Sequence, residues 1–282
     1  ATIGGLGLTG LILWAEIQLK PISNPYITME SIRFDTLTDF EELSASSDQG
    51  FEYTVAWIDC QASGRSIGRG IFMRGNHADT VPVRYPPLPK KNGFSIPPVV
   101  PGWLLNRVSM KLFNSLYYWR HFSRHRHATT PYLPFFYPLD KINNWNKLYG
   151  KNGFLQYQFV VPKGTDAMLE IMELIEARGY GSFLAVLKQF GDIESPGLMS
   201  FPRPGLTLAL DFPNNRGRIL FDFLDELDEL VRNVGGAVYP AKDARMSAKS
   251  FSLFYPNLEK FKNYVDPGIS SSFWRRVTSE TI

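Results

Sequence analysis

The amino-acid sequence predicts an α+β fold in which an antiparallel sheet is flanked by helices. Two strand-like segments, 51–60 and 69–75, are joined by the glycine-containing stretch QASGRSIG, as in a hairpin. Two further segments, 166–179 and 217–236, carry apolar residues at helical spacing. With 282 residues, of which 44% are hydrophobic and 20% charged, the chain is long enough for one large domain or two modest ones.

The hairpin segment contains Gly64, Gly68 and Gly70, which loosely match a phosphate-binding loop. A hairpin turn explains these glycines better.

Cys60 is the single cysteine, so the chain has no internal disulfide and a reducing compartment such as the cytoplasm is favoured. No stretch approaches the roughly 20 apolar residues of a spanning helix, and no signal peptide is recognised.

Both predicted helices have recognisable ends. The segment 166–179 begins after Thr165, a candidate N-cap, and stops at Gly179. Its buried face is predicted to comprise Met168, Ile171, Met172 and Ile175. The segment 217–236 ends on paired glycines and carries five acidic residues, which are interpreted as a solvated face and not as a metal site.

Three further strands each have two chemically different faces, because side chains alternate along a strand. The apolar faces include Leu155, Tyr157, Phe159, Val161, Leu206, Leu208, Leu210 and Phe212. The opposite faces carry Gln156, Gln158, Lys188, Phe190, Thr207, Ala209 and Asp211. Such a polar face is either simply solvated or the wall of a pocket for a polyhydroxylated molecule, since amides and lysine bind hydroxyl and phosphate groups.

Charge is unevenly distributed along the chain. The window 80–139 holds eight Lys or Arg residues, no acidic residue and half of the 20 prolines, which leaves 22 basic and 27 acidic residues elsewhere. Its first part is predicted to be an irregular excursion, because proline removes a hydrogen-bond donor and fixes φ. Its second part predicts an amphipathic helix with an apolar stripe of Leu105, Val108, Leu112, Leu116 and Trp119.

This helix has two interpretations. Basic and aromatic residues beside an apolar stripe favour peripheral contact of residues 84–127 with an anionic lipid surface, or a lipid-phosphate substrate. Alternatively the segment is a lid whose stripe packs on the body of the protein. Nucleic acid is not favoured, because bulky aliphatic residues interrupt the basic ones. Metal binding by His121, His125 and His127 is not favoured either, because three arginines stand among them.

Several segments then point to a known family. In chain order they are ATIGGLGLTG with Ile12, WIDC, YPLDKINNWNKLYGKNGFLQYQFVVP, SFLAVLKQFG, LDFP and YPAKDAR. Together they resemble flavin-dependent oxidases of the vanillyl-alcohol-oxidase type, within them the family that oxidises decaprenylphosphoryl-ribose. The resemblance runs along nearly the whole chain, and YQFV and YPAKD are its most specific parts.

The resemblance implies a division into domains. In this family a substrate-binding cap domain is inserted into the FAD-binding domain. Residues 1–21 would be the end of the FAD-binding domain, 22–236 the cap with 80–139 as a basic insertion, and 237–282 the return to the FAD-binding domain. Most of the FAD-binding domain is then expected upstream, so FAD would be bound mostly by residues outside this chain.

The resemblance also implies site residues. Lys242 matches a catalytic lysine at the flavin and the substrate, and Ile12 and Tyr239 match cofactor contacts. A fixed ammonium stabilises the negative charge that hydride transfer leaves on a flavin. Without the resemblance, an ion pair with neighbouring Asp243 would explain Lys242. The implied substrate-binding residues are Gln156, Gln158, Lys188, Phe190, Phe136, Thr207 and Ala209.

The implied function is oxidation of a secondary alcohol on a lipid-linked or phosphorylated pentose to a keto-sugar. A partner short-chain reductase would complete an epimerisation, and the protein would be cytoplasmic, peripheral to the inner membrane. Thr207 and Ala209 stand where the family has Asn and Cys, and Phe136-Tyr137-Pro138 stands where it has Tyr-His-Pro, so the sugar stays open. The alternatives are an aldonolactone or polyol oxidase, and a non-catalytic membrane-associated module.

Overall fold

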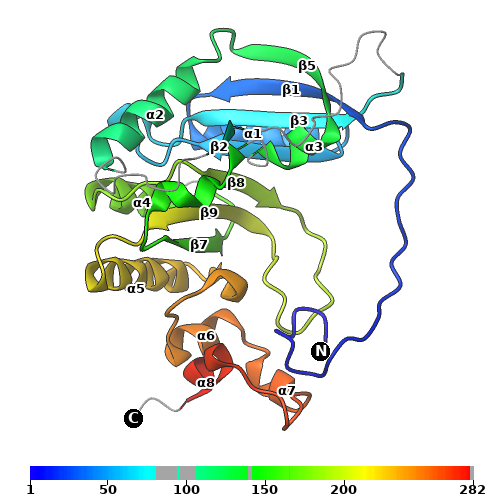
Figure 1. The fold of residues 1–282 in the computed structure, drawn as a ribbon, viewed down its shortest axis with the longest axis vertical. Coiled ribbons are helices and arrows are strands. Elements are labelled where there is room, and N and C mark those ends of the chain that lie inside the picture. Colours follow the sequence, from blue (N-terminus) through cyan, green and yellow to red (C-terminus); the bar gives the residue numbers. More distant parts are fainter. Residues whose placement is uncertain (81–93, 96–105, 139–141, 165, 280–282) are drawn as a thin grey trace.

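The computed structural model describes residues 1–80, 94–95, 106–138, 142–164 and 166–279. Most of the predicted proline-rich excursion lies outside the described residues, as do Thr165 and Leu105. Figure 1 shows the sheet above the C-terminal helices, with the N-terminal segment packed beside those helices and then running up the outside of the molecule to the first strand.

One large sheet organises the described part of the chain, and all of its neighbouring strands are antiparallel. This confirms the predicted fold class. In spatial order the eight strands are β10 (Ala237–Val238), β7 (Phe154–Val161), β9 (Gly205–Pro213), β8 (Ala185–Phe190), β2 (Tyr53–Ile58), β3 (Gly70–His77), β1 (Tyr26–Phe34) and β5 (His125–Pro131). A separate parallel pair joins β4 (Phe94–Ser95) to β6 (Ile142–Asn143).

The predicted hairpin is confirmed as β2 and β3, which pair directly. The connection contains the 3₁₀ turn η1 (Gly64–Ser66), and Gly68 adopts a φ of +90°, a backbone conformation that glycine tolerates. The α-helices of the described part are α1 (Leu37–Ser47), α2 (Arg107–Trp119), α3 (Tyr132–Phe136), α4 (Asp166–Ala177), α5 (Arg218–Asn233), α6 (Ala248–Phe254), α7 (Leu258–Lys262) and α8 (Ser272–Thr278).

Helices cover both faces of the sheet. On one face α1, α4 and α5 bury the apolar sides of the strands in a single core. The predicted face of α4 is fully buried there. Gly179, with a φ of +66°, follows the end of this helix, where a left-handed backbone conformation prevents its continuation. On the other face, Tyr118 of α2 packs against Trp57 and Ile71 of the β2–β3 hairpin. The remainder of that second face, over β7, β9 and β8, carries the polar residues.

Helix α2 is oriented differently from the lid interpretation. Its buried residues are Met110, Asn114 and Tyr118, whereas the described residues of the predicted apolar stripe face solvent. Val108 is 76%, Leu112 59% and Leu116 63% exposed. The buried side is fixed by a hydrogen bond from Asn114 Nδ2 to Asp59 Oδ1 (3.1 Å) and by the Tyr118 hydroxyl bonded to Asp35. Specific polar contacts therefore decide which side of this helix faces the body.

The acidic face of α5 is not wholly solvated as predicted, because Asp228 is buried. Its Oδ1 accepts hydrogen bonds from the Tyr157 hydroxyl (2.8 Å) and from Arg245 Nη2 (2.7 Å). Arg245 is itself only 7% exposed and also pairs with Asp225. Burial raises the pKa of Asp228. Burial by itself would lower the pKa of Arg245, but the ion pair with Asp228 raises it above its ordinary value. This contact anchors the YPAKDAR segment to α5.

The two ends of the described chain lie together. The Leu8 carbonyl accepts a hydrogen bond from the Asp266 amide (2.8 Å), and a Cβ on Gly5 would clash with the Ala1 carbonyl and crowd Phe261. Strand β10 joins the large sheet through β7. The proposed domain boundaries at 21 and 237 stay predictions. None of the described helices combines the length and apolarity needed to cross a membrane.

Removing the buried carboxylate of Asp228 is expected to destabilise the fold. The change Asp228→Ala leaves Arg245 buried with only Asp225 and removes the partner of the Tyr157 hydroxyl, so the free energy of unfolding should fall by about 3 kcal/mol. Urea unfolding followed by circular dichroism measures this. The control is Asp222→Ala on the same helix, whose exposed pair with Arg218 should contribute less than about 0.5 kcal/mol. Equal losses in the two variants would contradict the expectation.

Candidate active site

The predicted polar residues of three strands meet on one face of the sheet. Strand pairing places Gln156 opposite Asp211, Gln158 opposite Ala209, and Lys188 opposite Thr207. The alternate residues of the same strands are in the core, so these side chains all project from the other face. Polar side chains therefore form a continuous floor over β7, β9 and β8.

Hydrogen bonds across the strands fix the amides of this floor. Gln156 Nε2 donates to Asp211 Oδ1 (3.0 Å), and Gln158 Nε2 donates to Thr207 Oγ1 (3.2 Å). Each amide keeps its carbonyl oxygen as an acceptor for a further donor. The floor is thus preorganised and still offers groups that bind hydroxyls.

A short turn brings Lys242 to the edge of this floor. The 3₁₀ turn η5 (Pro240–Lys242) follows β10, and the Tyr239 amide donates to the Gln158 carbonyl (2.8 Å). Lys242 is close enough to Asp211 and Lys188 for both to affect its charge. The structure therefore brings the predicted catalytic lysine to the predicted substrate-binding residues.

The alternative explanation of Lys242, an ion pair with Asp243, is wrong. The Asp243 carboxylate pairs with Arg276 of α8, and it accepts hydrogen bonds from the amides of Arg245 (3.1 Å) and Met246 (2.8 Å). Within the described residues, no carboxylate lies within ion-pair distance of the Lys242 ammonium. The lysine thus keeps its charge available to a bound molecule.

The electrostatics of the site favour an anion. Burial lowers the pKa of Lys242, Asp211 counteracts this, and Lys188 adds to the lowering. Burial raises the pKa of Asp211, although the Gln156 amide and Lys242 oppose that shift. Lys242 thus feels both a second ammonium, that of Lys188, and one largely buried carboxylate, that of Asp211. A further negative charge, such as a phosphate or a reduced cofactor, would balance the two ammonium groups.

Aromatic rings border the floor. Tyr239 stacks on Phe201 with ring centroids 4.8 Å apart, and Phe201 contacts Phe190 edge-on at 5.9 Å. Phe136, on α3, reaches the neighbouring strand through Tyr53, whose ring it contacts edge-on at 4.8 Å. Phe190 and Tyr239 thus border the floor, whereas Phe136 lies farther along the same face, against Tyr53 of β2.

Ile12 is not brought into this arrangement. Its side chain is 67% exposed, in the extended N-terminal segment that Figure 1 shows running apart from the sheet. Its role as a cofactor contact stays a prediction.

The sequence analysis assigned no site role to Asp211. Its alternation with Thr207 and Ala209 along the strand was the pattern that could have placed it in the site.

Cys60 is not a reactive group in this structure. Its thiol donates to the Ser182 carbonyl (3.4 Å), and burial raises its pKa to about 12. The Ser182 hydroxyl in turn accepts from the Asp211 amide (3.0 Å). The WIDC segment is therefore connected to β9 through Ser182, and Cys60 does not supply a nucleophile.

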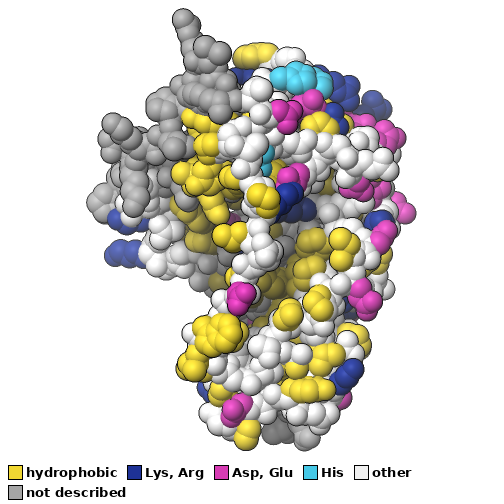
Figure 2. Space-filling view, turned by 90° about the vertical axis from the view of Figure 1, so that its right-hand side faces the viewer, with side chains coloured by type: hydrophobic (Ala, Val, Ile, Leu, Met, Phe, Trp, Pro, Cys, Tyr) yellow, Lys and Arg dark blue, Asp and Glu magenta, His cyan; other side chains and the backbone are white. Residues whose placement is uncertain are grey.

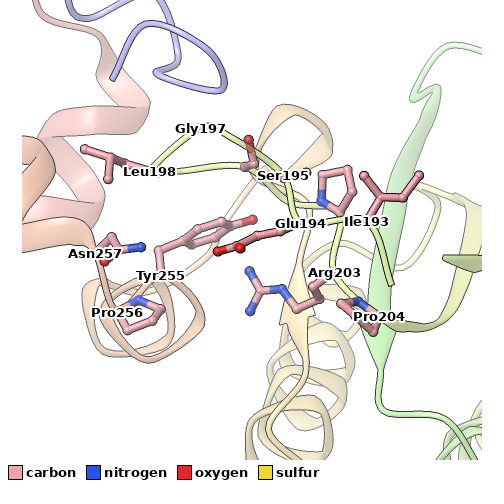
Figure 3. A pocket seen from close by; sticks show the side chains of 12 residues that line it. Ile193, Glu194, Ser195, Gly197, Leu198, Arg203, Pro204, Tyr255, Pro256 and Asn257 are labelled. Carbon is pink, nitrogen blue, oxygen red and sulfur yellow. The ribbon is translucent and has the colours of Figure 1, made fainter. Parts of the chain in front are cut away.

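A separate hollow of about 270 Å³ lies beside the C-terminal helices, between residues 193–204 and 255–257 (Figure 3). Figure 3 shows Arg203, Glu194 and Tyr255 pointing into it. Arg203 Nη1 donates to the Phe254 carbonyl (3.1 Å), and burial lowers its pKa. None of the sequence-predicted site residues lines this hollow. The chemistry is concentrated on the open sheet face, which is therefore the better candidate active site.

Comparison with known proteins shows clear relatives, including two that are similar to this chain along nearly its whole length. The chain is 35% identical over 95% of its length to decaprenylphosphoryl-beta-D-ribose oxidase of Mycolicibacterium smegmatis, and it spans 60% of that protein. It is 32% identical over 95% of its length to an uncharacterized Streptomyces coelicolor protein, described as lying in the mprA 5′ region, and spans 76% of it. No family model matches the chain.

The chain belongs to the family of FAD-linked oxidases that includes decaprenylphosphoryl-β-D-ribose oxidase. The resemblance predicted from the sequence motifs is thereby confirmed. Among solved structures, CrmK, a flavoenzyme of caerulomycin biosynthesis, aligns over 90% of this chain and 55% of its own at 10% identity with a TM-score of 0.43. That similarity is too low to carry an inference.

The raised pKa of Asp211 predicts a specific dependence of stability on pH. At pH values between the ordinary pKa of 3.8 and the raised pKa, the folded protein holds a proton on Asp211 that the unfolded chain has released. The contribution of this group to the free energy of unfolding therefore falls as pH rises through the window between 3.8 and the raised value. The measurement is the difference in urea stability between the unmodified chain and Asp211→Asn across this range.

That difference isolates Asp211, because the other titrating groups are common to both proteins. The unmodified chain should lose stability relative to Asp211→Asn with increasing pH. A flat difference, or one of opposite slope, would show that the carboxylate titrates normally in the folded state.

Proposed function

We propose that this chain forms the substrate-binding part of an FAD-dependent oxidoreductase that oxidises a secondary alcohol of a lipid-linked or phosphorylated pentose. The observation that carries the proposal is the Lys242 ammonium, which lies at the edge of a polar sheet face without a carboxylate partner among the described residues. The family relationship supports a flavin-dependent oxidation. The chemistry of the floor supports the proposed class of substrate.

The residues at Lys242 fit a flavin. A bound FAD supplies the hydride acceptor for an alcohol carbon. Lys242 would hold a fixed positive charge where negative charge develops on the cofactor, and the partial burial of this lysine strengthens such an interaction. Tyr239, held by stacking on Phe201, would be among the residues that hold the cofactor. Most other FAD contacts are proposed to come from outside this chain.

The floor fits a phosphorylated sugar. The amides of Gln156 and Gln158 offer carbonyl oxygens to sugar hydroxyls, and the buried Thr207 hydroxyl holds the Gln158 amide in place. Lys188 supplies a cation for a phosphate, and Phe190 a ring face for the sugar. Ala209 beside Thr207 makes this part of the floor smaller and less polar than the Asn and Cys expected in the family, which would alter the fit of the sugar.

The proposed reaction converts the substrate's CH–OH group into a ketone. The alcohol carbon would lose its hydrogen as hydride to the bound FAD, and the hydroxyl proton would pass to solvent, so that the C–O single bond becomes a carbonyl. The keto-sugar product is at the right oxidation level for a second enzyme, a nicotinamide-dependent reductase. Hydride return to the opposite face of the ring would complete an epimerisation.

Replacing the lysine tests the proposal directly. In the longest natural form of the protein, reconstituted with FAD, Lys242→Ala should slow anaerobic bleaching of the flavin spectrum by a polyprenyl-phosphoribose by about a hundredfold. Lys188→Ala should instead raise the substrate concentration at half-maximal rate, because its proposed role is binding. The matched control is Lys249→Ala on α6, an exposed lysine outside the site, which should bleach normally.

The choice of substrate separates the alternatives. Bleaching by the lipid-linked sugar and not by a simple aldonolactone supports the proposed substrate class. Bleaching by the lactone alone would make the protein an aldonolactone or polyol oxidase. Absence of bound flavin, or an undiminished rate in Lys242→Ala, would overturn the proposed function.

We further propose that α2 contacts a lipid surface that carries the substrate. Its exposed apolar residues continue into Trp119 and Phe122, which are 54% and 94% exposed. Lys111 and Arg120 flank them, and neither has a carboxylate partner among the described residues. An apolar stripe between cations is the arrangement that inserts at the boundary of an anionic membrane.

Charged substitutions on α2 test this contact. The double change Leu112→Glu and Leu116→Glu should abolish flotation of the protein with vesicles that contain anionic phospholipid, because carboxylates would replace the inserting side chains. Leu253→Glu, on a leucine of α6 that is similarly exposed (60%), should float normally. Flotation of the double variant at the unmodified level would contradict lipid contact through α2.

A further inference from the structure

A cluster of two histidines and one glutamate lies on the edge of the sheet, away from the candidate active site. His125 and His127 are separated by one residue on β5, so both point to the same face. Strand pairing places Glu30 of β1 directly opposite His127. Arg74 of β3 is opposite Glu30 in turn, and it packs beside α1 through the Ser47 hydroxyl. The cluster is therefore on the α1 side of the sheet, opposite the polar floor.

The distances within the cluster suit a metal ion. His125 Nε2 is 3.2 Å from Glu30 Oε2, and His127 Nδ1 is 3.5 Å from Glu30 Oε1. Atoms of all three side chains lie within 4.8 Å of one another. Two ligands of a tetrahedral Zn²⁺, each about 2.1 Å from the ion, are separated by roughly 3.4 Å. A small rotation of the exposed His127 would complete the set, with water in the fourth position.

The arginines that argued against metal binding in the sequence are directed elsewhere. Arg126 alternates with the two histidines and so projects from the other face of β5. Arg124 lies before the strand, and its guanidinium is 3.7 Å from Asp35. The nearest cation is Arg74, which pairs with Glu30 Oε2 at 2.7 Å. This contact orients the carboxylate and leaves Oε1 to the ligand, as a supporting hydrogen bond does in known metal sites.

The third histidine of the sequence motif is not part of the cluster. His121 is buried, and its backbone carbonyl binds Arg33. Glu30, which is far from the histidines in sequence, takes the third position because β1 pairs with β5. Two imidazoles and one carboxylate are a ligand set that zinc and other first-row divalent ions accept.

We infer that Glu30, His125 and His127 form a binding site for a divalent first-row transition metal such as Zn²⁺. Bound there, the ion joins β5, the edge strand, to β1. It has no part in the proposed oxidation, because its ligands are on the opposite face of the sheet from Lys242. Its effect is to stabilise the strand that follows α2.

Titration of the untagged chain with zinc chloride tests the inference. Isothermal titration calorimetry at pH 7.5 should show one saturable site per chain, and zinc should raise the midpoint of thermal unfolding. His127→Ala should weaken binding at least tenfold and remove the thermal shift. His127 is 66% exposed, so this variant is expected to fold normally. The control His77→Ala, on β3 and outside the cluster, should bind as the unmodified chain does.

Cobalt gives an independent readout. Co²⁺ bound by two imidazoles and a carboxylate should produce visible absorption bands that His125→Ala and His127→Ala both abolish. Failure to find one-to-one saturable binding would overturn the inference. So would equal zinc affinity in His127→Ala and the unmodified chain, because the histidines would then only be paired with Glu30.

Discussion

The alternation of side chains along β7, β9 and β8 is the constraint on which the rest of the structure depends. Leu208 and Leu210 point into the core, and Thr207, Ala209 and Asp211 point away from it. A shift of one residue in the pairing would exchange these faces and bury the amides and the lysine. The large apolar cluster therefore fixes not only the fold but also the chemistry of the open face. Core and candidate site are two sides of the same three strands.

The position of Lys242 depends on ion pairs that do not include it. Asp243 is held by Arg276, and Arg245 is held by Asp228. The segment that carries the lysine is thereby attached to α8 on one side and to α5 on the other. A buried ion pair brings little net stability but strongly disfavours other arrangements. Here these pairs direct the neighbouring charges away and leave one ammonium facing the floor.

Much of this could be predicted from the sequence, because the decisive patterns are local. Strand alternation identified the core and polar faces, and the spacing of Met168 and Ile175 identified the buried side of α4. Local patterns do not specify partners that are distant in sequence. The burial of Asp228 depends on Arg245 and Tyr157, and the face of α2 that is buried depends on Asn114 reaching Asp59. The cluster at Glu30 likewise exists only because β1 pairs with β5.

The same long-range contacts explain why motif resemblance and geometry agree at Lys242 and diverge at Ile12. Lys242 lies in a segment whose neighbours belong to this chain, so its position follows from contacts that are present. Ile12 lies in an extended segment with exposed side chains, where few contacts within the chain define its surroundings. Contacts with other residues fix the position of a side chain, and a sequence motif identifies the side chain but not the residues that it contacts.

The two edges of the sheet also bear on how the protein avoids self-association. An open edge offers unpaired backbone groups to the edge of another molecule. In the described part of the chain, one outermost strand, β10, is only two residues long, and the other, β5, carries histidines and an arginine. A two-residue strand is a poor template for intermolecular pairing, and charged side chains repel a second copy. The sheet thus ends on both sides in ways that oppose aggregation, although interior strands such as β7 and β9 are strongly apolar on one face.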